Sequence, residues 1–541
     1  MSVIAKERKA LNLSQKLSRL ALRLRDPEWR RYGGTLLGGK MLGIAMVLMI
    51  MAIVSGVFFT HVYAQTGTPE VKAADVVNPV NTAWTLIAAF LVFGMQVGFT
   101  MLEAGFCRSR ETVNVLVECV VDTCLCGILF YAVGFAFMFA HGNGFIGYHW
   151  FFLQNAPATY ETTGVAFLAV WIFQFAFADT CSTITSGAMI GRTGFVGDLL
   201  YSICVTGFIY PIIGHWAWGP DGWLATMGSA GYVFPSLGMP FHDFAGSTVV
   251  HTIGGFIALA GAIVLGPRLG RTFKRDGGGP MLPHDLTIAV SGGLILWFGW
   301  YGFNPGSTLS AMDFIGIGRV ATNTTLAACA AGLTSIIYGY IMTKKWDASY
   351  TTNGFLAGLV AITCPCYWVS PTGAVLLGGI AGVLVILGVD LLEWLRIDDP
   401  IGAVPVHGFC GIWGTLSLGL FACGKYGATG PISPDNSAPL AGLFYGGGLQ
   451  VLKAQIIGSA CITVATFAVA MVVMLAVNAI GMLRLPAEME AYGMDLHEHG
   501  ISAYPEYVIS ALGAPGGMRQ ELPTPAAKVA VPAATPLSHA S

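Results

Sequence analysis

The stretch DFAGSTVVHTIGGFIALAGAIVLG, residues 243–266, is an almost wholly apolar run with one histidine, His251, in its first third. A run of this length can cross about 30 Å of hydrocarbon as a helix. An ionisable side chain inside such a segment is costly, and it usually faces a cavity or the interior of a helical bundle. His251 is therefore a candidate functional residue, although a neutral histidine bonded to a neighbouring carbonyl or hydroxyl would also explain it.

Composition places most of the chain inside a membrane. Of its 541 residues, 55% are hydrophobic and 10% are charged, whereas roughly a quarter of an ordinary soluble domain is charged. Eleven apolar stretches after residue 75 are interpreted as transmembrane helices, of which the eighth is the shortest: 79–105, 113–140, 164–190, 196–217, 243–266, 283–304, 319–342, 352–366, 373–394, 404–423 and 449–482. Together they form one transmembrane domain over 75–482.

The opening segment has a second copy further along the chain. DFAGSTVVHTIGG at 243–255 is echoed by DPIGAVPVHGFCG at 399–411, and the aligned pairs are Asp243 with Asp399, His251 with His407, and Gly255 with Gly411. Five spans precede residue 267 and five more end at residue 423, so the second set enters from the opposite side. Inverted repeats place their substrate path at the repeat interface near the membrane midplane. We therefore expect an all-α integral membrane protein of 11 transmembrane helices, built as two inverted five-helix repeats plus one final helix.

A further apolar segment, at 41–59, precedes the eleven spans. It follows ten Lys and Arg residues within 1–40, and it is followed by VYA at 62–64, the small-residue pattern of a signal-peptidase site. We expect residues 1–64 to be a basic start and a signal peptide cleaved after Ala64. An uncleaved extra helix is the alternative, and both interpretations place residue 75 outside.

Basic residues in the connections set the expected orientation. If residue 75 lies outside, the outside segments hold three basic residues, or four with Arg319, and the inside loops hold ten: Arg108, Arg110, Arg192, Arg268, Arg271, Lys274, Arg275, Lys344, Lys345 and Arg396. Inside loops are enriched in Lys and Arg, so we expect a multi-pass cell-membrane protein with a cytoplasmic C-terminal tail at 483–510. The Pro- and Ala-rich residues 511–541 are expected to be disordered.

Cysteine spacing gives no sign of a metal centre. Most of the twelve cysteines lie inside apolar spans, where cysteine acts as a small hydrophobic residue. Cys364 and Cys366 flank Pro365 at a spacing too tight for an easy disulfide, and no paired metal-ligand spacings occur. We expect no metal, no cofactor and no nucleic-acid partner, and we expect that the protein is not an enzyme.

Six ordered motifs resemble the signatures of the ammonium transporter (Amt) family, within the Amt/Rh superfamily. They are GHWAWG at 214–219, DFAGSTVVH at 243–251, GWYGFNPGS at 299–307, NGFLAGLVAIT at 353–363, DDPIGAVPVHGFCGIWG at 398–414 and LRLPAEMEAYGMDLHEHGISAY at 483–504. The resemblance covers essentially all of 80–507. The stretch GFTMLEAGFCRSRETVNVL at 98–116 is more similar to the branch that includes plant transporters than to the enterobacterial form.

The resemblance implies an outer recruitment site for ammonium at Trp218 and Ser307, supported by Asp243 just below. An indole face attracts a cation, and a serine hydroxyl can accept a hydrogen bond from ammonium. Trp218 also suits the aromatic belt at a membrane interface. Asp243, placed before an apolar run, also suits a helix N-cap.

Phe303 matches the inner ring of the family's aromatic gate, and Phe177 matches a nearby vestibule aromatic. The sequence departs from the enterobacterial pattern at Cys181, which aligns with the outer gate phenylalanine. Either Phe177 alone narrows the vestibule, or the outer gate is looser.

His251 and His407 match the twin histidines of the family's hydrophobic pore. An ion is expensive to move through an apolar lumen, whereas neutral ammonia is not, so ammonium must release its proton near the vestibule. An imidazole can exchange hydrogen bonds with ammonia and relay a proton. The resemblance thus implies ammonium uptake in which ammonia and the proton travel separately and the net movement carries charge.

The family also implies partners. It forms homotrimers with a pore through each subunit, and its cytoplasmic tail often contacts a PII-type signal protein. The tail residues that match are Gly493, Asp495, His499, Gly500 and Tyr504.

Three other interpretations stay open. An electroneutral ammonia channel of the Rh type shares the twin histidines but typically lacks the pair that Trp218 and Ser307 supply. An ammonium sensor would need an output domain or a partner. A redox enzyme could use two intramembrane histidines as haem ligands, which a visible absorption spectrum would reveal.

Overall fold

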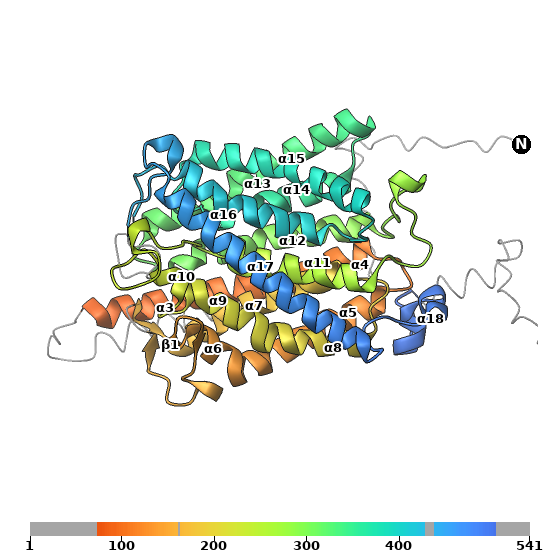
Figure 1. The fold of residues 1–541 in the computed structure, drawn as a ribbon, viewed down its shortest axis with the longest axis horizontal. Coiled ribbons are helices and arrows are strands. Elements are labelled where there is room, and N and C mark those ends of the chain that lie inside the picture. Colours follow the sequence, from red (N-terminus) through yellow and green to blue (C-terminus); the bar gives the residue numbers. More distant parts are fainter. Residues whose placement is uncertain (1–72, 161–162, 428–437, 505–541) are drawn as a thin grey trace, which may run out of the picture. The chain divides into compact units, whose positions relative to one another are not determined.

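The computed structural model describes residues 73–160, 163–427 and 438–504, which are predominantly helical (Figure 1). Within these ranges, ten helical segments are long and apolar enough to cross a membrane: Ala74–Phe106, Thr112–Phe139, Phe167–Gly187, Phe195–Thr226, Ser247–Leu265, Leu286–Thr308, Phe314–Thr343, Pro371–Leu395, Val404–Phe421 and Gln450–Ala479. The expected signal peptide, its cleavage site and the tail beyond residue 504 lie outside the described residues.

The ten segments match ten of the eleven expected spans. The expected eighth span, 352–366, corresponds to helix α14 (Ala348–Thr363), which has 16 residues. A transmembrane helix needs about 17–25 residues, so α14 is short for a crossing. It is nevertheless part of the bundle, because most of its side chains are buried between α13 (Phe314–Thr343) and α15 (Pro371–Leu395) and their neighbours.

The first half of the bundle, up to residue 266, contains eight α-helices of more than four residues. They are α3 (Ala73–Phe93), α4 (Met95–Phe106), α5 (Thr112–Leu129), α6 (Phe135–Phe139), α7 (Phe167–Gly187), α8 (Phe195–Cys204), α9 (Tyr210–Trp218) and α11 (Ile253–Leu265). Short helical turns join them: η1 (Phe130–Gly134), η2 (Phe151–Leu153), η4 (Val205–Ile209), α10 (Trp223–Thr226), η5 (Pro235–Leu237) and η6 (Ser247–Thr252). Two antiparallel strand pairs lie between α6 and α7, β1 (Gly142–Asn143) with β2 (Ile146–Gly147) and β3 (Thr159–Tyr160) with β4 (Val165–Ala166).

The second half begins after the turn η7 (Lys274–Asp276). Its remaining elements are α12 (Leu286–Phe303), η8 (Pro305–Thr308), α13, α14, α15, η9 (Val404–Phe409), α16 (Cys410–Phe421), η11 (Leu443–Tyr445), α17 (Gln450–Ala479), α18 (Ala487–Tyr492) and η12 (Asp495–His499). Helices α12 to α15 each have an N-cap residue whose side chain accepts a backbone N–H from the first turn. These residues are Asp285, Asp313, Asp347 and Ser370. Such N-caps satisfy donors that the first turn of a helix leaves free.

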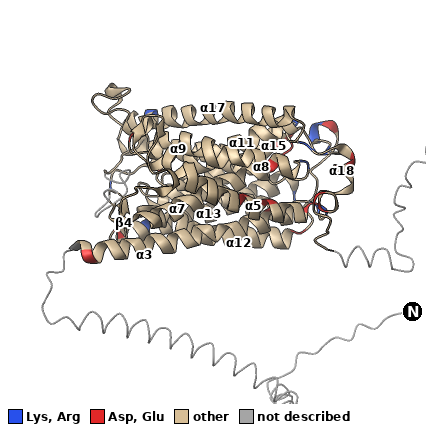
Figure 2. Ribbon diagram, turned by 90° about the horizontal axis from the view of Figure 1, so that it is seen from below, with Lys and Arg blue, Asp and Glu red and all other residues tan. Residues whose placement is uncertain are grey.

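Charge and burial separate the inside of the bundle from its periphery. Figure 2 shows most Lys and Arg near the ends of the bundle and little charge along its length. The span Phe167–Gly187 is 83% buried, whereas Gln450–Ala479, which packs across α11 and α16, is 28% buried (Figure 1). Helices α7, α11 and α16 therefore form the centre, and α17 lies on the outside.

Two glycines at equivalent repeat positions bring the central helices together. A Cβ at Gly255 would overlap the backbone of Gly408, and a Cβ at Gly411 would overlap the carbonyl oxygen of Ser247. Each glycine thus lets one repeat's helix approach the other repeat's first turn. Small residues permit this close backbone approach in membrane bundles.

A buried ion pair joins the two halves at the end of the bundle that carries α18. The guanidinium of Arg268, which follows α11, donates to both carboxylate oxygens of Asp398, which precedes η9, at 2.8 and 3.0 Å. Arg192 donates to the Asp398 carbonyl oxygen at 2.6 Å. Burial alone would raise the pKa of Asp398, but the hydrogen bonds and charge of Arg268, with the charge of Arg192, hold it well below its ordinary value.

We predict that Arg268→Met destabilises the fold by about 3 kcal/mol, because it leaves a buried carboxylate without its main partner. The folded pKa of Asp398 lies below its unfolded value, so the ion pair stabilises the protein at neutral pH and loses this contribution as the pH falls through the acidic range. Thermal unfolding in detergent at neutral and acidic pH measures both effects.

The control is Arg396→Met, which breaks an exposed pair with Asp276. Exposed pairs contribute little to stability, so this variant should unfold like the wild type. Equal destabilisation by the two substitutions would contradict a special role for the buried pair.

Candidate functional site

Five aromatic rings form a continuous column through the centre of the bundle. The ring centroids of Trp218 and Phe177 are 6.1 Å apart, those of Phe177 and Phe303 are 4.0 Å apart, and those of Phe303 and His251 are 5.4 Å apart. His251 then stacks on His407 at 5.2 Å. The column therefore joins one tryptophan to two histidines from equivalent positions of the two halves.

A cavity of about 420 Å³ lies at the Trp218 end of the column. Trp218, Phe177 and Ser307 line it, together with other residues from both halves of the chain. The Ser307 hydroxyl, held on the turn η8, donates to the Phe303 carbonyl oxygen at 2.8 Å. Its oxygen keeps the capacity to accept a hydrogen bond from a cation in the cavity.

Asp243 does not line this cavity, and its carboxylate is used by the backbone. Its two oxygens accept four N–H groups, from Gly246, Ser247, Thr248 and Val249, at 2.8 to 3.0 Å. Its carbonyl oxygen accepts the Trp218 indole N–H at 2.8 Å. Asp243 thus fixes both the first turn of the His251 helix and the orientation of the tryptophan that lines the cavity.

Asp399 repeats this arrangement in the second half. Its carboxylate accepts N–H groups from Gly402, Ala403 and Val404 at 2.8 to 3.1 Å. Backbone hydrogen bonds favour the charged form of this carboxylate, yet burial is the larger effect and raises the pKa of Asp399. Each histidine helix therefore begins at an aspartate whose carboxylate accepts several backbone N–H groups.

The two histidines contact each other directly. Their Nδ1 atoms are 3.2 Å apart, so one Nδ1 carries the proton and the other accepts it. His251 is fully buried, and its Nε2 has no hydrogen-bond partner among the described residues. When one ring donates through Nδ1, its own Nε2 is an acceptor and the other ring's Nε2 is a donor. The pair can therefore pass a proton by exchanging these roles.

This geometry does not suit a haem iron between the rings. Two axial ligands lie on opposite sides of a haem iron, so two histidine nitrogens at about 2 Å from it would be about 4 Å apart, whereas the two Nδ1 atoms are 3.2 Å apart. The interpretation of the histidine pair as haem ligands is therefore not favoured by their geometry.

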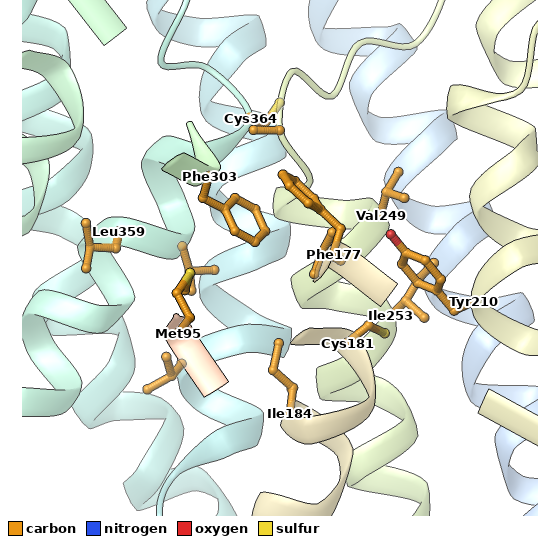
Figure 3. Packing of buried hydrophobic residues seen from close by; sticks show 14 of the residues in the cluster. Met95, Phe177, Cys181, Ile184, Tyr210, Val249, Ile253, Phe303, Leu359 and Cys364 are labelled. Atoms are coloured by element: carbon orange, nitrogen blue, oxygen red, sulfur yellow. The ribbon is translucent and has the colours of Figure 1, made fainter. Parts of the chain in front are cut away.

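Cys181 lies outside the ring column. It follows Phe177 by four residues on α7 and is fully buried. Figure 3 shows the rings of Phe177 and Phe303 facing each other, while Cys181 lies further along near Ile253 and Tyr210. The narrowest aromatic contact on the cavity side of His251 is therefore the one between Phe177 and Phe303.

The sequence reasoning missed Trp300. Its ring stacks on His251 with centroids 5.2 Å apart, and its indole N–H donates to Thr363 at 2.9 Å. Trp300 precedes Phe303 by three residues in the motif GWYGFNPGS, which places both rings on one face of α12. That helical spacing was the signal that could have identified it.

The tail motif packs against the start of α5 and against the loop that precedes α12. The Asp495 carboxylate accepts the Asn114 N–H at 3.0 Å, and His499 bonds to the Asn114 side-chain oxygen at 2.9 Å. The Tyr504 hydroxyl contacts His284 at 2.9 Å. Burial raises the pKa of Asp495. The tail is thus an integral part of this end of the bundle.

The ten apolar segments around a buried aromatic and histidine column are those of a multi-pass membrane protein. The chain belongs to the Ammonium Transporter Family, whose model matches residues 83–504.

Relatives and solved structures agree with this assignment. The chain is 39% identical over 485 residues to ammonium transporter Amt2 of Archaeoglobus fulgidus, covering 89% of this chain and 99% of the relative. It is 40% identical over 419 residues to ammonium transporter 1 member 1 of Arabidopsis thaliana, covering 75% and 81%. Among solved structures, it resembles a sensor Amt protein (TM-score 0.69, 35% identity, 79% of this chain and 99% of that chain). It also resembles Mep2 of Candida albicans (TM-score 0.69, 28% identity, 80% and 92%).

We predict that Phe303→Ala lowers ammonium transport several-fold, because this ring contacts both Phe177 and His251. Cys181→Ala should leave transport nearly intact, since Cys181 lies outside the ring column. Transport by purified protein in proteoliposomes, normalised to the amount of inserted protein, compares the two variants. Equal sensitivity at both positions would contradict this assignment of the gate.

Proposed function

We propose that the protein is an ammonium uptake transporter that recruits the cation at Trp218 and Ser307 and conducts ammonia past His251 and His407. The observation that carries the proposal is the direct contact of these two histidines at the end of a ring column that starts in the Trp218 cavity.

The cavity supplies the recruitment step. A cation there can lie against the Trp218 indole and donate a hydrogen bond to Ser307. The Asp243 carbonyl oxygen orients Trp218 by accepting its indole N–H. The Asp243 carboxylate, which is bound by backbone N–H groups, adds negative potential near the cavity. The rings of Phe177 and Phe303 then exclude water, so the ion gives up its proton before ammonia passes, and the histidine pair is the acceptor that relays this proton.

The histidine pair supplies the conduction step. Its two Nε2 atoms offer one acceptor and one donor to ammonia, and the shared Nδ1 proton lets the roles reverse. Ammonia and the proton pass separately, and the net movement carries charge.

The remaining expectations extend this proposal. We infer that the chain crosses the membrane eleven times and that α14 is the eighth crossing. The crossings form two inverted repeats followed by α17. They make up a transmembrane domain at 75–482, which follows a signal peptide. The protein then lies in the cell membrane, and its tail at 483–510 is cytoplasmic. The protein assembles as a homotrimer, and the tail and adjacent loops contact a PII-type regulatory protein.

Two alternatives make different use of the same site. An Rh-like channel would conduct ammonia without net charge, and the Trp218 cavity is the observation against it. A sensor would report ammonium rather than accumulate it. The likeness to a sensor Amt protein, at 35% identity over 99% of that chain, is the observation that favours a sensor as the second candidate function.

We predict that His251→Asp and His407→Asp each lower ammonium-over-potassium discrimination by about tenfold or more, the factor that about 1.4 kcal/mol produces. A fixed negative charge in the lumen favours passage of a whole cation. The double variant should differ from the sum of the single variants, because groups in contact couple. Currents with ammonium and with potassium in proteoliposomes measure the effect.

The matched control is His149→Asp, the same substitution at an exposed histidine, which should leave selectivity unchanged. Gel filtration in detergent reports assembly. A well-assembled His251→Asp variant with normal ammonium selectivity would remove this histidine from the permeation path.

A further inference from the structure

Five acidic side chains are buried inside the first half of the bundle, away from the ring column. They are Glu103 on α4, Glu118 and Asp122 on α5, Asp179 on α7 and Asp198 on α8, and none is more than 4% exposed. Figure 2 shows acidic positions on α5 and α8 within the otherwise uncharged bundle. The transport steps proposed above use none of them.

Asp198 lies at the centre of this carboxyl cluster. Its carboxyl accepts the Tyr201 hydroxyl, and it is close enough to Asp122 for one of the two to donate a hydrogen bond to the other when protonated. The charge of Asp198 acts on both Glu103 and Glu118. The charge of Asp179 acts on Asp122. These groups therefore share one electrostatic environment.

No positive charge balances the carboxyl cluster in the described part of the chain. None of the ion pairs there includes any of the five side chains. Several unpaired carboxylates packed together in a membrane interior would be prohibitively costly, through both desolvation and mutual repulsion. The cluster must therefore hold either protons or a cation.

A second observation separates these two occupants. The Ser202 hydroxyl on α8 is fully buried and lies near the Asp122 carboxyl, yet among the described residues it has no hydrogen-bond partner at normal distance. Within the same part of the chain, one oxygen of Asp122 and one of Asp198 are also without a hydrogen-bond partner. Within the described residues, however, no three Asp, Glu, His or Cys side chains converge as ligands of one metal ion. The oxygens lack partners but do not converge on one point. This arrangement favours protons shared among the carboxyl groups over a cation coordinated by them.

We propose that Glu103, Glu118, Asp122 and Asp198 form a proton-binding site, separate from the histidine pair, whose protons hold α4, α5 and α8 together. This proton-binding site exchanges protons with the solvent on the side of the molecule that carries the tail. Asn114 donates to Glu118 at 2.7 Å and bonds to His499 of the tail at 2.9 Å, so a polar chain leads from the cluster to the surface. A rise in pH on the tail side removes these protons, and the resulting carboxylates repel one another.

The other groups near the cluster are either neutral, so that they do not change its negative charge, or negative, so that they add to it. Cys119 on α5 and Tyr201 on α8 are neutral at physiological pH. Glu498 of the tail adds a negative charge near Asp198. His499 reaches the cluster through Asn114.

Infrared spectroscopy tests the proposal directly, because it separates the C=O stretch of a protonated carboxyl from that of a carboxylate. The full chain in lipid nanodiscs should show a protonated-carboxyl band at pH 7 that weakens as the pH rises. The variant Asp122→Asn/Asp198→Asn should lose most of this band. Its amides imitate the neutral acids in shape, so it should still fold.

Thermal unfolding gives a second readout. The folded protein binds more protons at the cluster than the unfolded chain does, so the wild-type unfolding temperature should fall as the pH rises from 6 to 9. The double variant should show a flatter dependence. Asp390→Asn, which removes an exposed carboxyl paired with Lys274, is the control and should behave like the wild type.

Two results would overturn the proposal. One is a wild-type protein without a protonated-carboxyl band at pH 7. The other is a band that appears only when sodium, potassium and calcium are removed, which would identify a cation site. Neither readout involves ammonium transport, so failure here is distinguishable from failure of the proposed function.

Discussion

The contact between His251 and His407 is the constraint on which the arrangement of the site depends. Two ionisable rings separated by 156 residues are both buried, and their Nδ1 atoms are 3.2 Å apart. Ionisable side chains inside a membrane bundle commonly pair with one another, and here each ring provides the Nδ1 partner of the other. The aspartates at the start of each histidine helix and the glycines that bring those helices together hold the two rings in place.

The same contact lies at the buried end of a ring column that begins at the Trp218 cavity. Phe303 and Trp300 pack on His251 from α12, and Phe177 covers Phe303 from α7. In the proposed mechanism, a cation lies against Trp218 and only neutral ammonia passes the two phenylalanines. The Arg268–Asp398 pair holds the two halves in register at one end of these helices.

Much of the fold could be predicted from sequence because membrane spans have a strong compositional signal. The repeat that relates His251 to His407 was visible as a fixed spacing of Asp, His and Gly. The role of Asp243 was only half visible: the sequence suggested both an N-cap and an outer charge, and the structure shows its carboxylate bound to four backbone N–H groups. The contacts of Trp300 and the carboxyl cluster around Asp198 were not foreseen. Single acidic residues in apolar spans reveal nothing about which helices they share until those helices are packed.

The central claim is that the nitrogen crosses as ammonia while its proton crosses separately, so that transport carries charge. The most direct test records current and ammonium uptake in the same wild-type proteoliposomes after an ammonium jump. The account predicts an inward positive transient whose size follows the amount of nitrogen taken up. Ammonia uptake without any current would contradict it and would favour the electroneutral channel.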